Sequence, residues 1–290
     1  MDERDSLRAI GEWLPGADDD AAVVDDLVFT TDMLHQRADF PAGTTRYTAG
    51  WRAVGASLSD IAAMGASATA AVAVYAAPEF DADDLHAFLD GARDVCELTG
   101  GQYVGGDLDQ HEEFTVVSSA IGRTDAPVRR STAAPGDVVC VTGTLGRTGA
   151  ALRLFDRGDH DQANDLFRFV PRVAAGEAIA PHATAMMDSS DGLARSLHQL
   201  AEASDCGFAV EWERIPVDEA VREVATGDER RACSLYTGED FELVCTLPPE
   251  RVAAARTASP VPLTVVGDVT EAGVTMDGDP LPDRGYTHGS

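Results

Sequence analysis

Six aspartates stand where they could bind a hard metal ion. Each is expected at the end of a strand or helix, beside glycine, hydroxyl or small apolar residues. Carboxylate oxygens suit Mg²⁺, which takes one or two carboxylates per ion together with waters and substrate phosphate oxygens. Like charges of this kind cluster in a fold only when cations offset their repulsion. The six are Asp20, Asp32, Asp60, Asp107, Asp188 and Asp191.

The segment around Asp60 is predicted to be the second half of an amphipathic helix. Small residues fill the turn before Asp60, which leaves room for a large polar ligand, and Gly65 supplies a C-terminal stop. The alternative is a solvated aspartate on a surface helix, which is the common situation for this residue type. Apolar residues recur at alternating steps of four and three, at Tyr47, Trp51, Val54, Leu58 and Ile61.

The first two aspartates of the set are expected at one end of a β-hairpin. An acidic turn runs into an apolar strand, Asp25-Asp26 forms a tight turn, and residues 27–32 form the return strand. Asp20 and Asp32 would then be close enough to share one cation. Residues 33–45 are predicted to form a loop.

Three further segments combine glycine or serine with acidic residues. Gly105-Gly106-Asp107 follows a short predicted strand, and its glycines permit close approach of a ligand to the backbone. Asp188-Ser189-Ser190-Asp191-Gly192 ends another strand, and Ser190 could cap a helix or hydrogen-bond a nucleotide. Thr237-Gly238-Glu239-Asp240 immediately precedes a third strand.

Strands and helices alternate on both sides of a segment that contains prolines and arginines. A short helix is expected at residues 6–14, and strands are expected in the second half near 137–142, 183–187, 208–212, 241–247 and 261–266. The predicted fold class is α+β (mixed α/β) with two domains. The domains are residues 1–125 and 137–290, joined by a linker at 126–136, and the second is predicted to be an α/β, sandwich-like domain.

Charge and composition exclude several classes of function. The net charge is −28, so neither nucleic acid nor an anionic membrane is an expected partner. All 22 basic residues are arginine, so a Walker-A loop, a protein-kinase strand lysine and Schiff-base chemistry are excluded. Phosphate would be bound by arginine, backbone N–H groups and metal ions. Arg129-Arg130 is either such a clamp or a solvated basic pair. The evenly spread acid excess fits adaptation to high salt.

The five cysteines are widely spaced without a Cys-x-x-Cys pair, which favours reduced, buried thiols over disulfides or zinc. No stretch of about 18 apolar residues occurs, and the charged N-terminus lacks an apolar signal core. We therefore expect a cytoplasmic location. No Gly-x-Ser-x-Gly segment is present, and no residue is predicted to act as a covalent nucleophile.

Taken in order, the motifs resemble those of the thiamine-monophosphate kinase family, within the aminoimidazole-ribonucleotide synthetase-like superfamily. One motif alone is weak, whereas the ordered set covers nearly the whole chain and is specific. The matching segments are Asp19–Val23, Thr30–Leu34, Ser57–Ala66, Gly105–Asp107, Arg130–Ser131, Pro135–Asp137, Val141–Gly146, Asp188–Leu193, Gly238–Leu243 and Gly285–His288.

The resemblance implies roles for individual positions. The magnesium ligands would be Asp20, Thr30, Thr31, Asp32, Asp60, Asp107, Asp188 and Asp191. ATP would contact Gly105, Gly106, Arg130 and Ser190, and the substrate would contact Asp39, Glu239 and Tyr286, with Tyr286 packed on the heterocycle. Asp39 stands where usual members have a substrate-contacting histidine, and it could instead face the cationic thiazolium. The resemblance also implies a homodimer that pairs through the first domain's sheet.

The expected reaction is Mg²⁺-dependent, direct in-line transfer of the γ-phosphoryl group of ATP to thiamine monophosphate, giving thiamine diphosphate and ADP. The acceptor is already an anion, so positioning and charge neutralisation suffice without a strong general base. One alternative is another ATP-using enzyme of the superfamily, of the amidine ligase or hydrogenase-maturation type. A second alternative is a non-catalytic nucleotide- or cation-binding protein.

Overall fold

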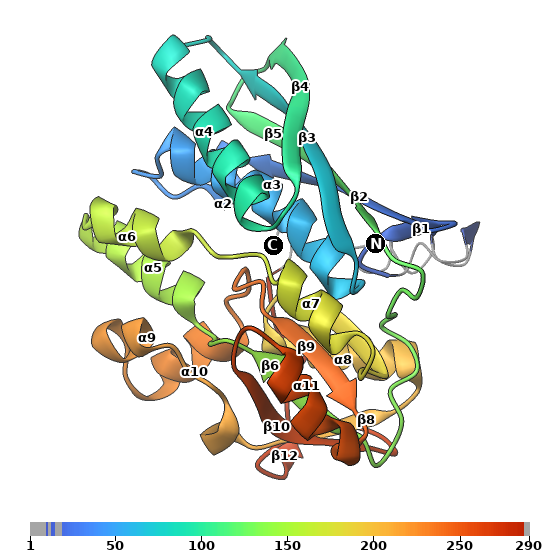
Figure 1. Cartoon of the computed structure of the whole chain (residues 1–290). Helices are drawn as coiled ribbons and strands as arrows, with labels where there is room; N and C mark the ends of the chain where they lie inside the picture. The colour runs from blue at the N-terminus through green and yellow to red at the C-terminus, as the bar shows by residue number, and fades with distance from the viewer. Residues whose placement is uncertain (1–9, 11–12, 15–18, 287–290) are drawn as a thin grey trace.

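The structure is a computed structural model that describes residues 10, 13–14 and 19–286. The helix predicted at residues 6–14 therefore lies largely outside the described residues. Two domains follow one another along the chain, each built on a mixed sheet with helices (Figure 1). This arrangement confirms the predicted fold class. Within the described part of the chain, no helix has both the length and the apolar character needed to cross a membrane.

The first domain is a five-stranded sheet with two long helices on one face. The strand order is β1-β2-β5-β3-β4, and every pair is antiparallel except β3–β4. The strands are β1 (Ala22–Val24), β2 (Leu27–His35), β3 (Ser67–Ala77), β4 (Gln102–Gln110) and β5 (Thr115–Arg123). The helices are α2 (Gln36–Asp39), α3 (Arg46–Ala63) and α4 (Ala82–Leu98).

Two predicted boundaries in this domain are wrong. Strand β2 extends to His35, because Met33, Leu34 and His35 continue to pair with β5, and a short helix replaces the start of the expected loop. Strand β4 continues through Gly105-Gly106 with a bulge rather than ending before them. A Cβ on Gly106 would lie 1.7 Å from the carbonyl oxygen of Ala73, so strand packing alone requires this glycine.

Helix α3 is held in place by close contact with α4. A Cβ on Gly50 would lie 2.1 Å from the carbonyl oxygen of Phe88, and one on Gly91 would lie 2.0 Å from that of Tyr47. The two backbones can approach this closely only because these positions are glycines. The helix ends as predicted at Gly65, whose φ of +65° lies in the left-handed region. Asp60 is thereby fixed in the last turn of α3.

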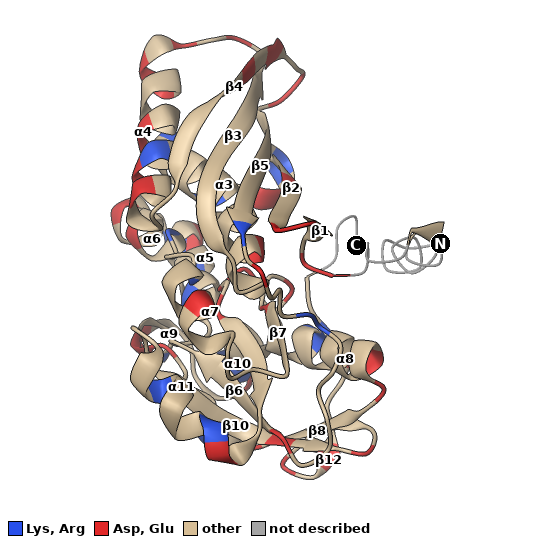
Figure 2. Cartoon of the chain, turned by 45° about the vertical axis from the view of Figure 1, so that its right-hand side comes forward, with Lys and Arg blue, Asp and Glu red and all other residues tan. Residues whose placement is uncertain are grey.

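The opposite face of this sheet is open and apolar. Phe29, Met33, Val72 and Ile121 are between 39% and 49% exposed, and the strand register places all four on one face. Figure 2 shows this face in front of α3, with β3 and β5 almost free of charged residues. An uncovered apolar sheet face of this kind is typical of a surface that packs against another protein.

The second domain is a seven-stranded mixed sheet in the order β12-β11-β8-β10-β6-β9-β7. Its strands are β6 (Val138–Thr142), β7 (Ala185–Asp188), β8 (Gly207–Val210), β9 (Leu243–Leu247), β10 (Leu263–Thr270), β11 (Val274–Met276) and β12 (Asp279–Pro280). Its helices are α5 (Arg147–Arg157), α6 (His160–Phe167), α7 (Val173–Ile179), α8 (Leu193–Ser204), α9 (Glu219–Val224), α10 (Gly227–Leu235) and α11 (Val252–Ala258). The sequence did not predict β11, β12 or α10, because the two strands are very short and α10 is rich in charged residues.

The two domains share a packed junction around the end of α3. A Cβ on Gly176 of α7 would lie 2.2 Å from the carbonyl oxygen of Ala62. Ala62 and Ala63 belong to one buried cluster with Val173 and Ile179 of the second domain. This packing places the last turn of α3 directly against the second sheet.

Candidate active site at the junction of the domains

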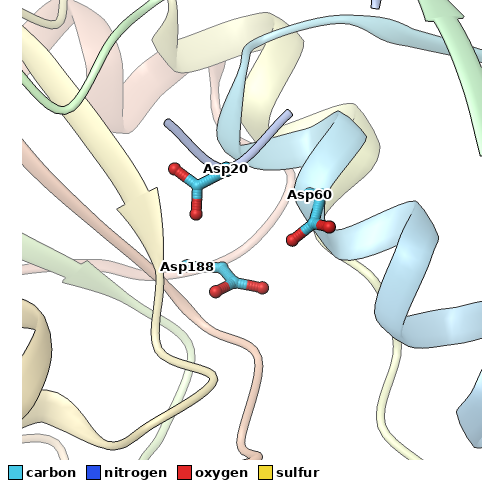
Figure 3. Close-up of side chains that lie close together, drawn as sticks. All are labelled: Asp20, Asp60 and Asp188. Atoms are coloured by element: carbon cyan, nitrogen blue, oxygen red, sulfur yellow. The ribbon is translucent and has the colours of Figure 1, made fainter. Parts of the chain in front are cut away.

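Three of the predicted metal ligands converge at this junction. One carboxylate oxygen from each of Asp20, Asp60 and Asp188 lies within 4.8 Å of the other two. Figure 3 shows the side chains coming from the segment before β1, from α3 and from the end of β7. Asp188 is fully buried and Asp20 is 9% exposed. Residues separated by up to 168 positions in sequence are therefore brought to one point, at a spacing that suits shared ligation of a cation.

Hydroxyl groups orient these carboxylates. The Thr30 hydroxyl donates to Asp60 Oδ2 at 2.6 Å, and the Ser59 hydroxyl donates to Asp188 Oδ2 at 2.6 Å. Asp32, which neighbours Asp60, accepts from the Ser57 hydroxyl at 2.6 Å. These bonds fix the carboxylates without neutralising them. The small residues that precede Asp60 on α3 thus supply hydrogen-bond donors as well as space.

The cluster carries an excess of negative charge, which shows in the pKa values of its carboxylates. Burial, reinforced by the charge of Asp20, raises the pKa of Asp188 to about 7. Burial and the carboxylates of Asp32, Asp188 and Asp20 raise the pKa of Asp60 well above its ordinary value. Burial also raises the pKa of Asp32. A divalent cation among these groups would remove the repulsion that holds protons on them.

Arg130 lies beside this cluster. Its guanidinium makes a two-pronged contact with Asp20, from Nε to Oδ2 at 3.0 Å and from Nη2 to Oδ1 at 2.9 Å. The neighbouring Arg129 contacts Asp19 at 3.5 Å. The predicted phosphate clamp is therefore adjacent to the carboxylates rather than solvated as an isolated basic pair.

A cavity of about 560 Å³ adjoins the cluster, and Asp32 and Ser190 belong to its wall. Its volume is in the range of small-molecule sites. The side chains that line it are acidic, hydroxyl-bearing, aromatic or apolar, and His35 also reaches it. The predicted site residues on its wall are Thr31, Asp32, Ser190, Asp191, Glu239 and Tyr286.

The acidic residues of the Gly238–Leu243 segment have separate functions. Glu239 lines the cavity, and its backbone N–H donates to the carbonyl oxygen of Ser190 at 2.6 Å. Asp240 accepts from two backbone N–H groups at the start of α5, and burial raises its pKa to about 7. Glu242 accepts from Arg172 Nε at 2.7 Å. Only Glu239 is thus placed to meet a ligand, while the other two hold the domain together.

Arg52 is a site residue that sequence reasoning missed. Its side chain is 2% exposed, and Nη2 contacts Glu239 Oε2 at 2.8 Å. The guanidinium stacks on Phe167, with its central carbon 3.6 Å from the ring centroid. The only signal in the sequence is a basic residue inside a helix of small and apolar residues. The buried guanidinium of Arg52 in the first domain therefore pairs with Glu239 of the second domain and holds its carboxylate in place.

Four predicted site residues reach neither the carboxylate cluster nor the cavity beside it. Asp39 is 5% exposed, and its carboxylate accepts a hydrogen bond from the Tyr286 hydroxyl. Gly105, Gly106 and Asp107 line a separate cavity of about 190 Å³ with Tyr75 and Phe88.

The strand register separates Asp107 from β2. Asp107 pairs with Val74, Val74 with Val117, and Val117 with Met33, so three strand spacings lie between Asp107 and β2. That distance is about 14 Å. The same pairings put Asp107 on the open face of the sheet. Within one chain, Asp107 is thus remote from the cluster of Asp20, Asp60 and Asp188.

Comparison with known proteins places the chain in a family. Residues 18–124 match the family described as AIR synthase related protein, N-terminal domain, and residues 134–277 match its C-terminal domain. A thiamine-monophosphate kinase of Halobacterium salinarum is 63% identical over 99% of this chain and 100% of its own length. The chain belongs to the thiamine-monophosphate kinase family. A family member from Methanospirillum hungatei is 42% identical over 99% of each chain. The resemblance based on motifs is thereby confirmed.

Solved structures of the thiamine-monophosphate kinase family have the same architecture. The structure described as AaThiL complexed with AMPPCP and TMP has a TM-score of 0.89 at 27% identity, covering 99% of this chain and 97% of that one. The enzyme from Stenotrophomonas maltophilia has a TM-score of 0.83 at 31% identity, covering 95% and 96%. The hydrogenase maturation protein HypE in complex with ATP, at 21% identity and a TM-score of 0.72 over 88% of this chain and 83% of its own, shares the fold alone.

Proposed function

We propose that this protein is a thiamine-monophosphate kinase, which transfers the γ-phosphoryl group of ATP to thiamine monophosphate and releases thiamine diphosphate and ADP. The observation that carries the proposal is the carboxylate cluster of Asp20, Asp60 and Asp188 beside a cavity of substrate size. The 63% identical relative carries the name of this activity, and a structural relative binds an ATP analogue together with TMP.

The cluster fits Mg²⁺ by its chemistry. Three carboxylates converge, nearby groups are hydroxyls, and the raised pKa values of Asp60 and Asp188 signal charge that a cation would offset. Bound there, Mg²⁺ would neutralise the phosphates of ATP and the developing charge of the transferred group. The full set of proposed ligands is Asp20, Thr30, Thr31, Asp32, Asp60, Asp107, Asp188 and Asp191.

Arg130 and Ser190 are proposed to bind the phosphates of ATP. The chain has no lysine, and the planar guanidinium of Arg130 already lies beside Asp20. An arginine held by a carboxylate in this way presents its remaining donors in a fixed direction. Gly105 and Gly106 are also proposed to contact ATP, since glycines allow a ligand to approach the backbone closely.

A homodimer would bring Asp107, which is remote from the carboxylate cluster within one chain, close to the cluster of a second chain. The open face of the first sheet carries Phe29, Met33, Val72 and Ile121, and Asp107 projects from the same face. Two such faces packed about a two-fold axis would cover the apolar residues of both copies. They would also carry Asp107 of each subunit toward the other subunit. We therefore propose that each active site uses Asp107 of the partner subunit.

Mixing two inactive variants tests this shared site. Asp107→Asn and Asp188→Asn subunits, each inactive alone, are expected to regain about a quarter of wild-type activity after mixing and reassembly. The fraction follows because random pairing makes about half the dimers mixed, and one of their two sites is intact. No recovery, with mixed dimers demonstrated by differential tagging, would exclude a site shared in this way.

The substrate end of the cavity is proposed to lie at Glu239 and Tyr286. Thiamine monophosphate carries a cationic thiazolium, which suits an acidic wall, and Tyr286 offers an aromatic ring for a heterocycle. Its phosphate would then point toward the metal cluster. The acceptor phosphate oxygen attacks the γ-phosphorus in line and ADP leaves, so the chain needs to position and neutralise its two anionic substrates. No side chain needs to form a phospho-enzyme.

A product assay tests the function. The purified protein is incubated with γ-labelled ATP, Mg²⁺ and thiamine monophosphate at high potassium chloride concentration, and labelled thiamine diphosphate is expected. Asp60→Asn is expected to abolish turnover with the circular dichroism spectrum unchanged, whereas Asp125→Asn, at an exposed position, serves as the matched control. Failure of the wild-type protein to form thiamine diphosphate under these conditions would refute the proposal.

A further inference from the structure

Asp39 lies at the end of α2 with both carboxylate oxygens engaged. Asp39 is 5% exposed. Oδ2 accepts from the backbone N–H of His35 at 2.6 Å, which closes the turn between β2 and α2. Oδ1 accepts from the hydroxyl of Tyr286 at 2.9 Å, across 247 positions of sequence. The wall of the substrate cavity includes Ala38 and Tyr286 on either side of this contact but does not include Asp39.

Tyr286 belongs to a tail segment that is docked along the second domain. The backbone N–H of Tyr286 donates to the carbonyl oxygen of Asp191 at 3.0 Å. Gly285 lies so close that a Cβ there would be 2.3 Å from the same oxygen. Asp283 pairs with Arg195 of α8 at 2.8 Å. These contacts fix the backbone of the tail, and the hydroxyl bond to Asp39 fixes the aromatic ring to the first domain.

We infer that Asp39 is a positioning residue: it holds the ring of Tyr286 across the domain junction, so that the ring forms one wall of the substrate cavity. The inference rests on the proposed function and assigns Asp39 an indirect role in place of substrate contact. Asp39 is almost fully buried and is not part of the cavity wall, so a ligand in the cavity has little access to its carboxylate. A tyrosine with its hydroxyl bound to a charged acceptor loses less freedom when a heterocycle packs on it.

A double-mutant cycle distinguishes positioning from direct contact. Asp39→Ala, Tyr286→Phe and the double variant are compared in the full-length protein by kcat and by KM for thiamine monophosphate and for ATP. Tyr286→Phe retains the ring and removes only the hydrogen bond. We expect each single variant to raise KM for thiamine monophosphate roughly tenfold, the factor of a hydrogen bond to a charged group. The double variant is expected to show no further rise, and KM for ATP and kcat should change little.

Two controls sharpen the comparison. Asp39→Asn keeps one acceptor oxygen for the Tyr286 hydroxyl, so its KM is expected to rise less than that of Asp39→Ala. Tyr47→Phe removes a similar bond, from the Tyr47 hydroxyl to Asp94 at 2.9 Å between α3 and α4, and should leave all three constants unchanged. Multiplicative effects of the Asp39 and Tyr286 changes, or an unchanged KM in Asp39→Ala, would overturn the inference.

Hydrogen exchange provides a readout that does not depend on the kinase activity. Asp39→Ala and Tyr286→Phe are both expected to increase amide exchange in residues 281–286 by similar factors, and Tyr47→Phe should not. If the wild-type protein forms no thiamine diphosphate, the kinase proposal fails, but the exchange result still decides whether Asp39 holds Tyr286. Unchanged exchange in Asp39→Ala would refute the positioning role whatever the enzyme's activity.

Discussion

Replacing Asp188 by asparagine should separate metal binding from folding. Asp188 is completely buried, and its carboxylate lies within 4.8 Å of those of Asp20 and Asp60. Asparagine has nearly the same shape and can keep the hydrogen bond from Ser59, which donates to Asp188 at 2.6 Å. The substitution therefore removes a charge with little change in packing. We expect it to abolish turnover and to stabilise the metal-free protein.

The size of this stabilisation follows from the pKa. The pKa of Asp188 is raised from 3.8 to about 7 in the folded state. Such a shift corresponds to at most about 4 kcal/mol of destabilisation above pH 7, at about 1.4 kcal/mol per unit. Asparagine also carries a burial cost, so the expected gain in unfolding free energy is about 1–3 kcal/mol. For a chain of this size that gain raises the melting temperature by a few degrees.

Thermal denaturation at pH 8 measures both effects. Wild type, Asp188→Asn and the exposed-site control Asp125→Asn are melted at a fixed high potassium chloride concentration, once with EDTA and once with excess MgCl₂. In EDTA, Asp188→Asn should melt above wild type, whereas Mg²⁺ should raise the melting temperature of wild type and of the control much more than that of Asp188→Asn. The electrostatic reasoning is wrong if Asp188→Asn melts below wild type in EDTA. It is also wrong if Mg²⁺ stabilises both equally.

Three further predictions follow from the same structure. The folded-state pKa of Asp188 lies above its unfolded value, so the metal-free protein should lose stability as the pH rises from about 4 to about 7. The increase in melting temperature caused by Mg²⁺ should grow over the same pH range. An increase that is independent of pH would contradict this prediction. Arg52→Met should cost about 1.5–3 kcal/mol in unfolding free energy and raise KM for thiamine monophosphate, because Glu239 loses its charged hydrogen-bond partner. Chemical denaturation and kinetics would show a much smaller effect if the pair were unimportant. Ile121→Asp should convert the proposed homodimer to monomers in sedimentation experiments and abolish activity, whereas Asp26→Asn should do neither. An active monomer would argue against a shared site.

Local signals explain which parts of the fold were predictable. The helix that carries Asp60 follows from its apolar periodicity and from the stop at Gly65, and both depend on neighbouring residues only. The start of α4 also depends on neighbouring residues only, because the Asp81 side chain accepts from the backbone N–H groups of Asp83 and Asp84. Boundaries failed where tertiary pairing extended an element, as at His35, which remains paired with β5. Short strands such as β11 exist only because a neighbouring strand supplies their hydrogen bonds.

The chemistry of the site was determined by the sequence, and its arrangement by the tertiary structure. The acidic motifs supply oxygen ligands of the kind that Mg²⁺ prefers, and the absence of lysine leaves arginine and backbone N–H groups to bind phosphate, because residue types set which ligands are available. Distances between motifs depend on long-range packing, which no local pattern encodes. Only the folded chain brings Asp20 and Asp188 together, leaves Asp107 on the open face, and pairs Arg52 with Glu239 across 187 positions.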